Sequence, residues 1–235
     1  MPEPLPNIIA ETDDVLVIDK PAGLIVHSDG RTIEPSLAAW LLERYQALEH
    51  VGEPWVSPQG ERILIAGIVH RLDRTTSGVM LVAKTPETFA YLKGEFKARR
   101  VEKIYRAFVY GHVEADEGTI VAKIMRSSEP PRRWYARACA SEDKRAAITK
   151  WRVLERFEDD NEPVSYLELS PKTGRTHQLR VHLASIGHPI VGDHLYAPAS
   201  LSRLGFTRPA LHAHRISFIF AGEYTTYTAP LPENF

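Results

Sequence analysis

The stretch HRLDRTTSG at residues 70–78 places one carboxylate, Asp73, close to two arginines, Arg71 and Arg74. An aspartate in a loop is more often a turn or cap residue than part of a site. Here, however, Asp73 is the only acid in residues 63–86, and apolar, β-branched segments flank the loop on both sides. We therefore expect it near the core. Neighbouring cations keep a carboxylate ionised, which suits nucleophilic or electrostatic work better than donating a proton.

A second block, TGRTHQLRVHLASIG at residues 173–187, supplies a candidate partner. Helical spacing predicts a helix over 176–187, with Arg180 at the edge of an apolar stripe that includes Leu179. Such an arginine usually snorkels to the surface. The rarer alternative is a buried guanidinium that needs an acid. Because the helix and the turn before it contain no acid, that acid would come from elsewhere in the fold, and Asp73 is the candidate.

The rest of the chain is rich in strands. Short apolar or alternating runs predict strands at 15–18, 66–72, 78–84, 102–113, 119–125, 147–155, 164–170, 211–220 and 224–229. Helices are predicted only at 35–49, 85–99 and 176–187, with a loop at 50–62. This order predicts an α+β fold with a mixed, largely antiparallel sheet and flanking helices and loops. No repeat or linker interrupts the chain, so we expect a single catalytic domain over 1–235.

The composition is that of an ordinary globular protein. The chain has 235 residues, a formal net charge of -1 and 43% hydrophobic residues, which excludes a generally basic, histone-like protein. One cysteine, Cys139, allows no internal disulfide and favours a reducing compartment. The N-terminus does not resemble a signal peptide, and no apolar run approaches the roughly 18 residues that span a bilayer. We expect a cytoplasmic protein, not bound to a membrane, that acts as a monomer.

Both blocks resemble the two signature motifs of the RluA-type pseudouridine synthases. Four further stretches resemble landmarks of that family in the same order along the chain: DKPAGLIVH (19–27), EKIYRAFVYG (102–111), GHPIVGDHLY (187–196) and LHAHRISF (211–218). The resemblance implies the mixed sheet of the pseudouridine synthase catalytic fold, with no cofactor and no metal. It also implies a stand-alone catalytic domain, because the N-terminal residues leave no room for the small RNA-binding domain that many relatives carry.

The resemblance further implies that the chain converts uridine in RNA to pseudouridine. The glycosidic bond is broken, the uracil is rotated, and the bond is remade to carbon 5. Carried over by motif position, Asp73 is the essential carboxylate, Arg180 pairs with it and Tyr105 packs on the target base. The base must be flipped out of its helix, at a cost of a few kcal/mol, and Arg71 would fill the vacancy. Three further positions of the second motif would bind substrate: Arg175, His177 and Leu179.

Local charge fits an RNA partner better than net charge does. Residues 93–106 carry six Lys or Arg against two Glu, and residues 126–137 interleave four arginines with Trp134 and Tyr135. Arginines mixed with aromatic side chains suit backbone contacts and base stacking, although each segment is equally consistent with a solvated face. The expected partner is RNA, either rRNA or tRNA.

Two other classes of function are consistent with parts of the sequence. The C-terminal half holds six histidines, of which His212 and His214 would share one face of a strand, as a pair of metal ligands does. A metal hydrolase would need more ligands, and Asp193 is the acid that could join them, but no HExxH motif is present. A non-catalytic RNA-binding module derived from the synthase family is the other alternative. The complete set of catalytic motif residues argues against it.

Overall fold

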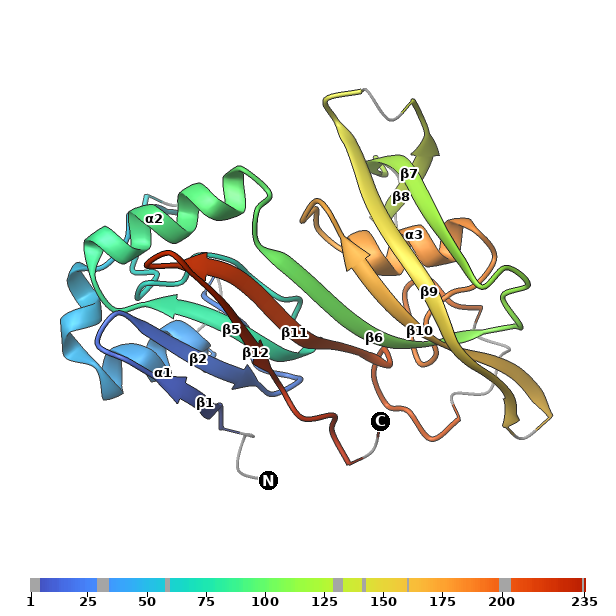
Figure 1. The fold of residues 1–235 in the computed structure, drawn as a ribbon, viewed down its shortest axis with the longest axis horizontal. Coiled ribbons are helices and arrows are strands. Elements are labelled where there is room, and N and C mark those ends of the chain that lie inside the picture. Colours follow the sequence, from blue (N-terminus) through green and yellow to red (C-terminus); the bar gives the residue numbers. More distant parts are fainter. Residues whose placement is uncertain are drawn as a thin grey trace. The chain divides into compact units, whose positions relative to one another are not determined.

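A computed structural model of the chain describes residues 5–28, 34–57, 60–128, 133–140, 143–159, 161–198, 204–233 and 235 (Figure 1). The fold divides into two compact units. One comprises residues 1–101 and 213–230, and the other comprises residues 102–212 and 231–235. The single domain over residues 1–235 stays a prediction.

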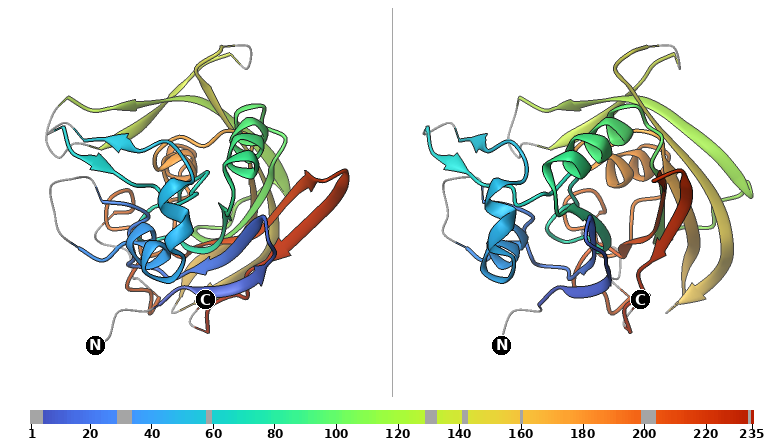
Figure 2. Two further views of the ribbon diagram at one scale, coloured as in Figure 1. Left: turned by 90° about the vertical axis from the view of Figure 1, so that its left-hand side faces the viewer. Right: turned by 60° about the vertical axis from the view of Figure 1, so that its left-hand side comes forward.

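The first unit is built on strands in the order β1 (Asn7–Glu11), β2 (Val15–Lys20), β5 (Ser77–Ala83) and β11 (Leu211–Phe220), with β12 (Glu223–Thr228) paired to β11. The pairs β1–β2, β2–β5 and β11–β12 are antiparallel. All seven residues of β5 are buried, as expected of a strand covered on both faces. A separate hairpin, cyan in Figure 2, joins β3 (Trp55–Val56) to β4 (Arg62–Ile63).

The helices of this unit begin at side-chain caps. They are α1 (Leu37–Arg44) and α2 (Pro86–Lys97), with a 3-10 helix, η1 (Gln46–His50), after α1. The hydroxyls of Ser36 and Thr85 each accept a hydrogen bond from the backbone N–H three residues on, which satisfies a donor that the first helical turn leaves unpaired. Phe89 and Leu92 are the buried apolar residues of α2, and they hold it on the unit's core.

The second unit has five strands in the order β6 (Glu102–Tyr110), β10 (Glu162–Pro171), β9 (Ala146–Asp159), β7 (Glu117–Arg126) and β8 (Trp134–Ala138). Its four pairings are antiparallel. The helix α3 (Gln178–Ser185) contacts β7, β8 and β9. Leu179 and Leu183 of α3 belong to the same buried cluster as Val109, Leu167 and Leu169 of the strands, so the helix is fixed on the sheet by its apolar stripe.

The predicted α+β class with a largely antiparallel sheet is confirmed. The strand predicted at 66–72 is wrong: this segment makes a single bridge, from Ile68 to Val82. Ala66 and Gly67 both have positive φ, of 47° and 71°, which turns the chain before a strand can form. The helix predicted at 35–49 is interrupted at Tyr45, whose φ of −133° and ψ of 79° lie outside the helical region.

Strand pairing also extends beyond the sequence prediction. The strands β1 and β8 were not predicted, and the loop expected at 50–62 contains the short hairpin of β3 and β4. Across the described residues, no helix combines the length and the apolar character that a membrane span requires.

The buried face of α3 carries a histidine as well as leucines. His182 is completely buried, and its Nδ1 lies 3.0 Å from Thr149 Oγ1. Removal from water disfavours the charged imidazolium. Burial thereby lowers the pKa of His182 from 6.5 to about 4.

We expect His182→Gln to weaken the dependence of stability on pH. At pH 5 this imidazole is neutral in the folded chain and protonated in the unfolded chain. The free energy of unfolding therefore falls as the pH drops through 6.5 toward 4. From pH 8 to pH 5 this one group accounts for a loss of about 2 kcal/mol. Chemical denaturation at both pH values measures the loss, with the exposed His50→Gln as matched control. An equal loss in wild type and His182→Gln would contradict the assignment.

Candidate active site

Asp73 lies in the loop that leads into β5. The residue is half-buried, whereas Arg71 and Arg74 on either side are exposed. The N–H of Thr76 donates to the carbonyl of Asp73 at 3.1 Å, which closes a tight turn. The guanidinium of Arg74 pairs with Glu34 at the surface. Arg71 is exposed, and its role in filling the RNA stack stays a prediction.

A buried lysine fixes the backbone of this loop. Lys20 has no exposed surface. Its ammonium donates to three backbone carbonyls, those of Pro21, Leu24 and Arg74, at 2.7, 2.9 and 3.3 Å. The N–H of Gly23 donates to the same Arg74 carbonyl at 2.8 Å. Because a buried ammonium needs acceptors, these bonds tie the turn after β2 to the loop of the candidate carboxylate.

Both ends of the loop are also held. The Nε2 of His70 accepts the N–H of Leu81 at 2.9 Å, and its ring stacks on Phe96 with centroids 4.6 Å apart. At the other end, Gly78 has a φ of +118°, and a Cβ there would lie 2.2 Å from the carbonyl oxygen of Ala213. A side chain at this position would push β5 away from β11. The loop thus has little freedom at either boundary.

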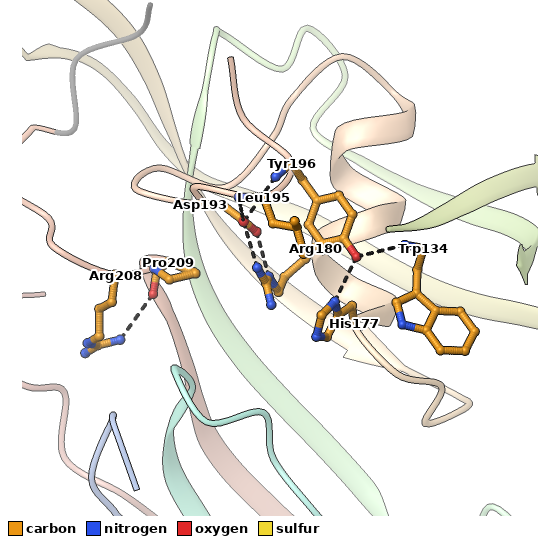
Figure 3. Close-up of polar contacts among 8 residues, drawn as sticks. All are labelled: Trp134, His177, Arg180, Asp193, Leu195, Tyr196, Arg208 and Pro209. Atoms are coloured by element: carbon orange, nitrogen blue, oxygen red, sulfur yellow. Dashed lines mark hydrogen bonds and ion pairs between the residues drawn. The ribbon is translucent and has the colours of Figure 1, made fainter. Parts of the chain in front are cut away.

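Arg180 of α3 is buried and forms a bidentate ion pair with Asp193 (Figure 3). Its Nε donates to Oδ2 at 2.6 Å and its Nη2 donates to Oδ1 at 2.7 Å. The Asp193 side chain has no exposed surface, and its Oδ1 also accepts the N–H groups of Leu195 and Tyr196 at 3.0 and 3.3 Å. Charge-assisted bonds of this geometry are among the strongest in proteins.

The buried alternative for Arg180 is therefore confirmed, and the acid found on it is Asp193, thirteen residues along the chain. The sequence offered Asp193 only as a possible metal ligand, whereas in the structure both of its carboxylate oxygens accept hydrogen bonds from Arg180. The additional pairing of Arg180 with Asp73 stays a prediction.

This guanidinium lies over an aromatic ring (Figure 3). The Arg180 Cζ lies 5.0 Å from the centre of the Tyr196 ring. The Tyr196 Oη lies 2.8 Å from His177 Nδ1 and accepts the N–H of Trp134 at 3.3 Å. His177 stands at the N-cap of α3 with a φ of 54°, a left-handed conformation that few non-glycine residues adopt. The structure thus brings together two of the predicted residues, Arg180 and His177.

The loop before α3 carries a third predicted residue, Arg175, whose side chain is exposed. The buried Gln178 fixes this loop. Its Oε1 accepts from Thr173 Oγ1 at 2.7 Å and from the N–H of Arg175 at 3.1 Å. Its Nε2 donates to the carbonyl of Ile148 and to Thr149 Oγ1 in β9. The exposed arginine therefore projects from a rigid backbone.

The two remaining predicted residues, Tyr105 and Leu179, lie beside and within the core of the second unit. Tyr105 of β6 is half-buried against the core of the second unit, and Leu179 is buried in α3. Leu179 is thus part of the support of the helix. Asp73 belongs to the first unit, whereas Tyr105 and Arg180 belong to the second. Their assembly into one site stays a prediction.

Sequence patterns predicted no structural role for four residues: Lys20, Asp193, Tyr196 and Arg208. The guanidinium of Arg208 donates to the carbonyls of Pro209 and Leu211 at 3.2 and 3.4 Å, and burial lowers its pKa. The signal that could have revealed Asp193 and Tyr196 was their place in the quoted landmark GHPIVGDHLY. Within the described ranges, no three His, Cys, Asp or Glu side chains gather as metal ligands would.

Comparisons with known proteins give one consistent result. The family model described as RNA pseudouridylate synthase matches residues 14–185. An uncharacterized RNA pseudouridine synthase of Synechocystis sp. is 35% identical, covering 97% of this chain and 66% of the relative. The ribosomal large subunit pseudouridine synthase D of Neisseria meningitidis serogroup A is 37% identical, covering 100% of this chain and 60% of the relative. The chain thus spans less than two thirds of the length of either protein.

A solved structure agrees with these matches. Human RNA pseudouridylate synthase domain containing 1 superposes with a TM-score of 0.75 at 29% sequence identity. The alignment covers 97% of this chain and 84% of the human protein chain. The similarity therefore extends across the strands and helices of both units.

We predict that Asp193→Asn destabilises the chain by about 3–5 kcal/mol, because it leaves the buried guanidinium of Arg180 without its counter-charge. Urea denaturation measures this loss. The matched control is Glu53→Gln, which breaks the exposed ion pair between Glu53 and Lys93 and costs less than about 1 kcal/mol. If both variants lost similar small amounts, the ion pair of Arg180 would not be the constraint described here.

Proposed function

The chain belongs to the RNA pseudouridylate synthase family, and from this premise we propose that it isomerises uridine in RNA to pseudouridine. The observation that carries the proposal is the family match over residues 14–185. That range contains the predicted carboxylate Asp73 as well as Tyr105 and Arg180. It also contains the rigid loops described above, which a site of this kind requires.

Ribosomal RNA is the proposed target, with tRNA as the alternative. The Neisseria meningitidis relative, 37% identical to this chain, is named for the large ribosomal subunit. Unmodified fragments of large-subunit rRNA are therefore the first substrates to test, and tRNA transcripts are the second.

Each proposed role follows from the chemistry of the side chain. Cleavage of the glycosidic bond leaves an electron-poor sugar, and the carboxylate of Asp73 traps or stabilises that centre. Tyr105 offers an aromatic platform for the flipped uracil. The exposed guanidinium of Arg71 is long and planar, so it can stack and hydrogen-bond in the vacancy that the base leaves. We propose that Arg180, already held by Asp193, also orients Asp73.

The strand β8 supports the proposed contact with RNA. Tyr135 and Arg137 share one face of β8, because residues two apart on a strand do so, and Arg133 directly precedes the strand. We call these three residues the basic face of β8. Both arginines are exposed, and the residue area of Tyr135 is 45% exposed. Guanidinium groups around an exposed ring can bind phosphates and stack a base together.

The other basic segment, residues 93–106, is a weaker candidate for RNA contact. Three of its cations are paired with acids: Lys93 with Glu53, Arg100 with Glu95 and Arg106 with Glu168. A cation that already has a carboxylate partner gains less from a phosphate. The basic face of β8 is therefore the surface that we propose to contribute more to RNA affinity.

We expect Asp73→Asn to abolish pseudouridine formation while RNA binding survives, because the amide preserves the shape of the carboxylate but not its charge. Chemical mapping of pseudouridine in unmodified rRNA fragments and tRNA transcripts gives the activity, and filter binding gives the affinity. Asp13→Asn, on an exposed turn of the same unit, is the control and should retain full activity. Near-normal turnover by Asp73→Asn would refute the role of this carboxylate.

Binding should weaken as salt increases, since phosphate contacts release counterions. Arg133→Gln and Arg137→Gln should each lower the slope of log affinity against log salt by about one. Lys93→Gln removes a cation that Glu53 already neutralises and serves as the control. A slope that stays at the wild-type value in both arginine variants would eliminate the basic face of β8 as the docking surface.

A further inference from the structure

Tyr196 contacts three residues, two at α3 and one at the start of β8 (Figure 3). Its ring lies over the guanidinium of Arg180 in α3, with the Cζ 5.0 Å from the ring centre. Its hydroxyl is bonded to His177 at the N-cap of the same helix. The same oxygen accepts the backbone N–H of Trp134, the first residue of β8.

The contact with Arg180 controls a degree of freedom that Asp193 does not. The bidentate pair holds the edge of the guanidinium through Nε and Nη2, but two bonds along one edge still permit a tilt out of the plane. The Tyr196 ring, over which the Cζ lies, opposes that tilt and adds a cation–π attraction. The backbone N–H of Tyr196 also donates to Asp193 at 3.3 Å. Tyr196 therefore restrains both members of the ion pair.

The hydroxyl connects this restraint to a surface that can meet RNA. Trp134 stands between Arg133 and Tyr135, two members of the basic face of β8. The hydrogen bond from its N–H to Tyr196 Oη, at 3.3 Å, joins the backbone of that strand to the ring over Arg180. The 2.8 Å bond to His177 holds the hydroxyl from the side of α3. A displacement of β8 by bound RNA would reach Arg180 through a single side chain.

We propose that Tyr196 is a positioning residue that couples docking of RNA on the basic face of β8 to the orientation of Arg180, an inference that rests on the proposed function. The ring restrains the orientation of the guanidinium. The hydroxyl, through its two hydrogen bonds, links the ring to β8 and to the N-cap residue His177. The two parts of one side chain thus have separable tasks, and two substitutions can test them separately.

Kinetics on a structured RNA provide the first test. Tyr196→Phe keeps the ring and removes the hydroxyl, so the KM for RNA should rise about fivefold or more while kcat stays within about twofold. Tyr196→Leu removes both the ring and the hydroxyl, so kcat should also fall about tenfold or more because Arg180 loses its contact with the ring. Tyr224→Leu, an exposed tyrosine on β12, is the control. Equal kinetic constants for wild type and both Tyr196 variants, with only a lowered Tm, would overturn the proposal.

A second readout does not depend on product formation. The Nε–Hε signal of Arg180 in an NMR spectrum should keep its position in Tyr196→Phe and move in Tyr196→Leu. Addition of an RNA fragment that binds should shift this signal in wild type and shift it less in Tyr196→Phe. A response to RNA that is identical in wild type and Tyr196→Phe would overturn the coupling. If wild type binds RNA but forms no pseudouridine, the proposed function fails, while this response still decides the role of Tyr196.

Discussion

The buried ion pair between Arg180 and Asp193 is the constraint on which the second unit's candidate functional residues depend. Two charges that have left water must satisfy each other, because an unpaired buried charge costs several kcal/mol. Asp193 meets this requirement with two bonds from the guanidinium and two from the backbone that follows it. The loop after α3 is therefore fixed to the helix, and this places the Tyr196 ring against the guanidinium of Arg180. His177 is then reached through the hydroxyl of the same tyrosine.

In the first unit, too, a buried cation holds the backbone beside a candidate residue, Asp73. Its loop is held by the buried ammonium of Lys20, which donates to three backbone carbonyls and so ties the turn after β2 to Arg74, the residue that follows the carboxylate. The packing of Gly78 against the backbone of Ala213 leaves no space for a side chain. In both units a buried cation places a candidate functional residue, and precise placement is what catalysis by orientation and charge requires.

Local signals in the sequence predicted much of the fold. The helix at 85–99 and the alternating strands lie within short windows, where periodicity is informative. The strand predicted at 66–72 does not form. Its apolar residues favour a strand, but Ala66 and Gly67 both have positive φ and turn the chain before Ile68. Asp193 was not predicted as the partner of Arg180 for another reason. Thirteen residues and a loop separate the two, and sequence periodicity does not predict a contact over such a separation. Asp73 and Arg180 were singled out from their local sequence, whereas the other candidate residues came from the family resemblance.

The proposed reaction remakes the bond between sugar and base at carbon 5 of uracil, which must displace the hydrogen at that carbon. RNA labelled with tritium at carbon 5 of uridine makes this step measurable, in the presence of a chelator. Isomerisation by this chain should release tritium in an amount equal to the pseudouridine formed in the same RNA. Tight binding of rRNA and tRNA with no tritium released from either would contradict it, and would favour a binding module that has lost the reaction.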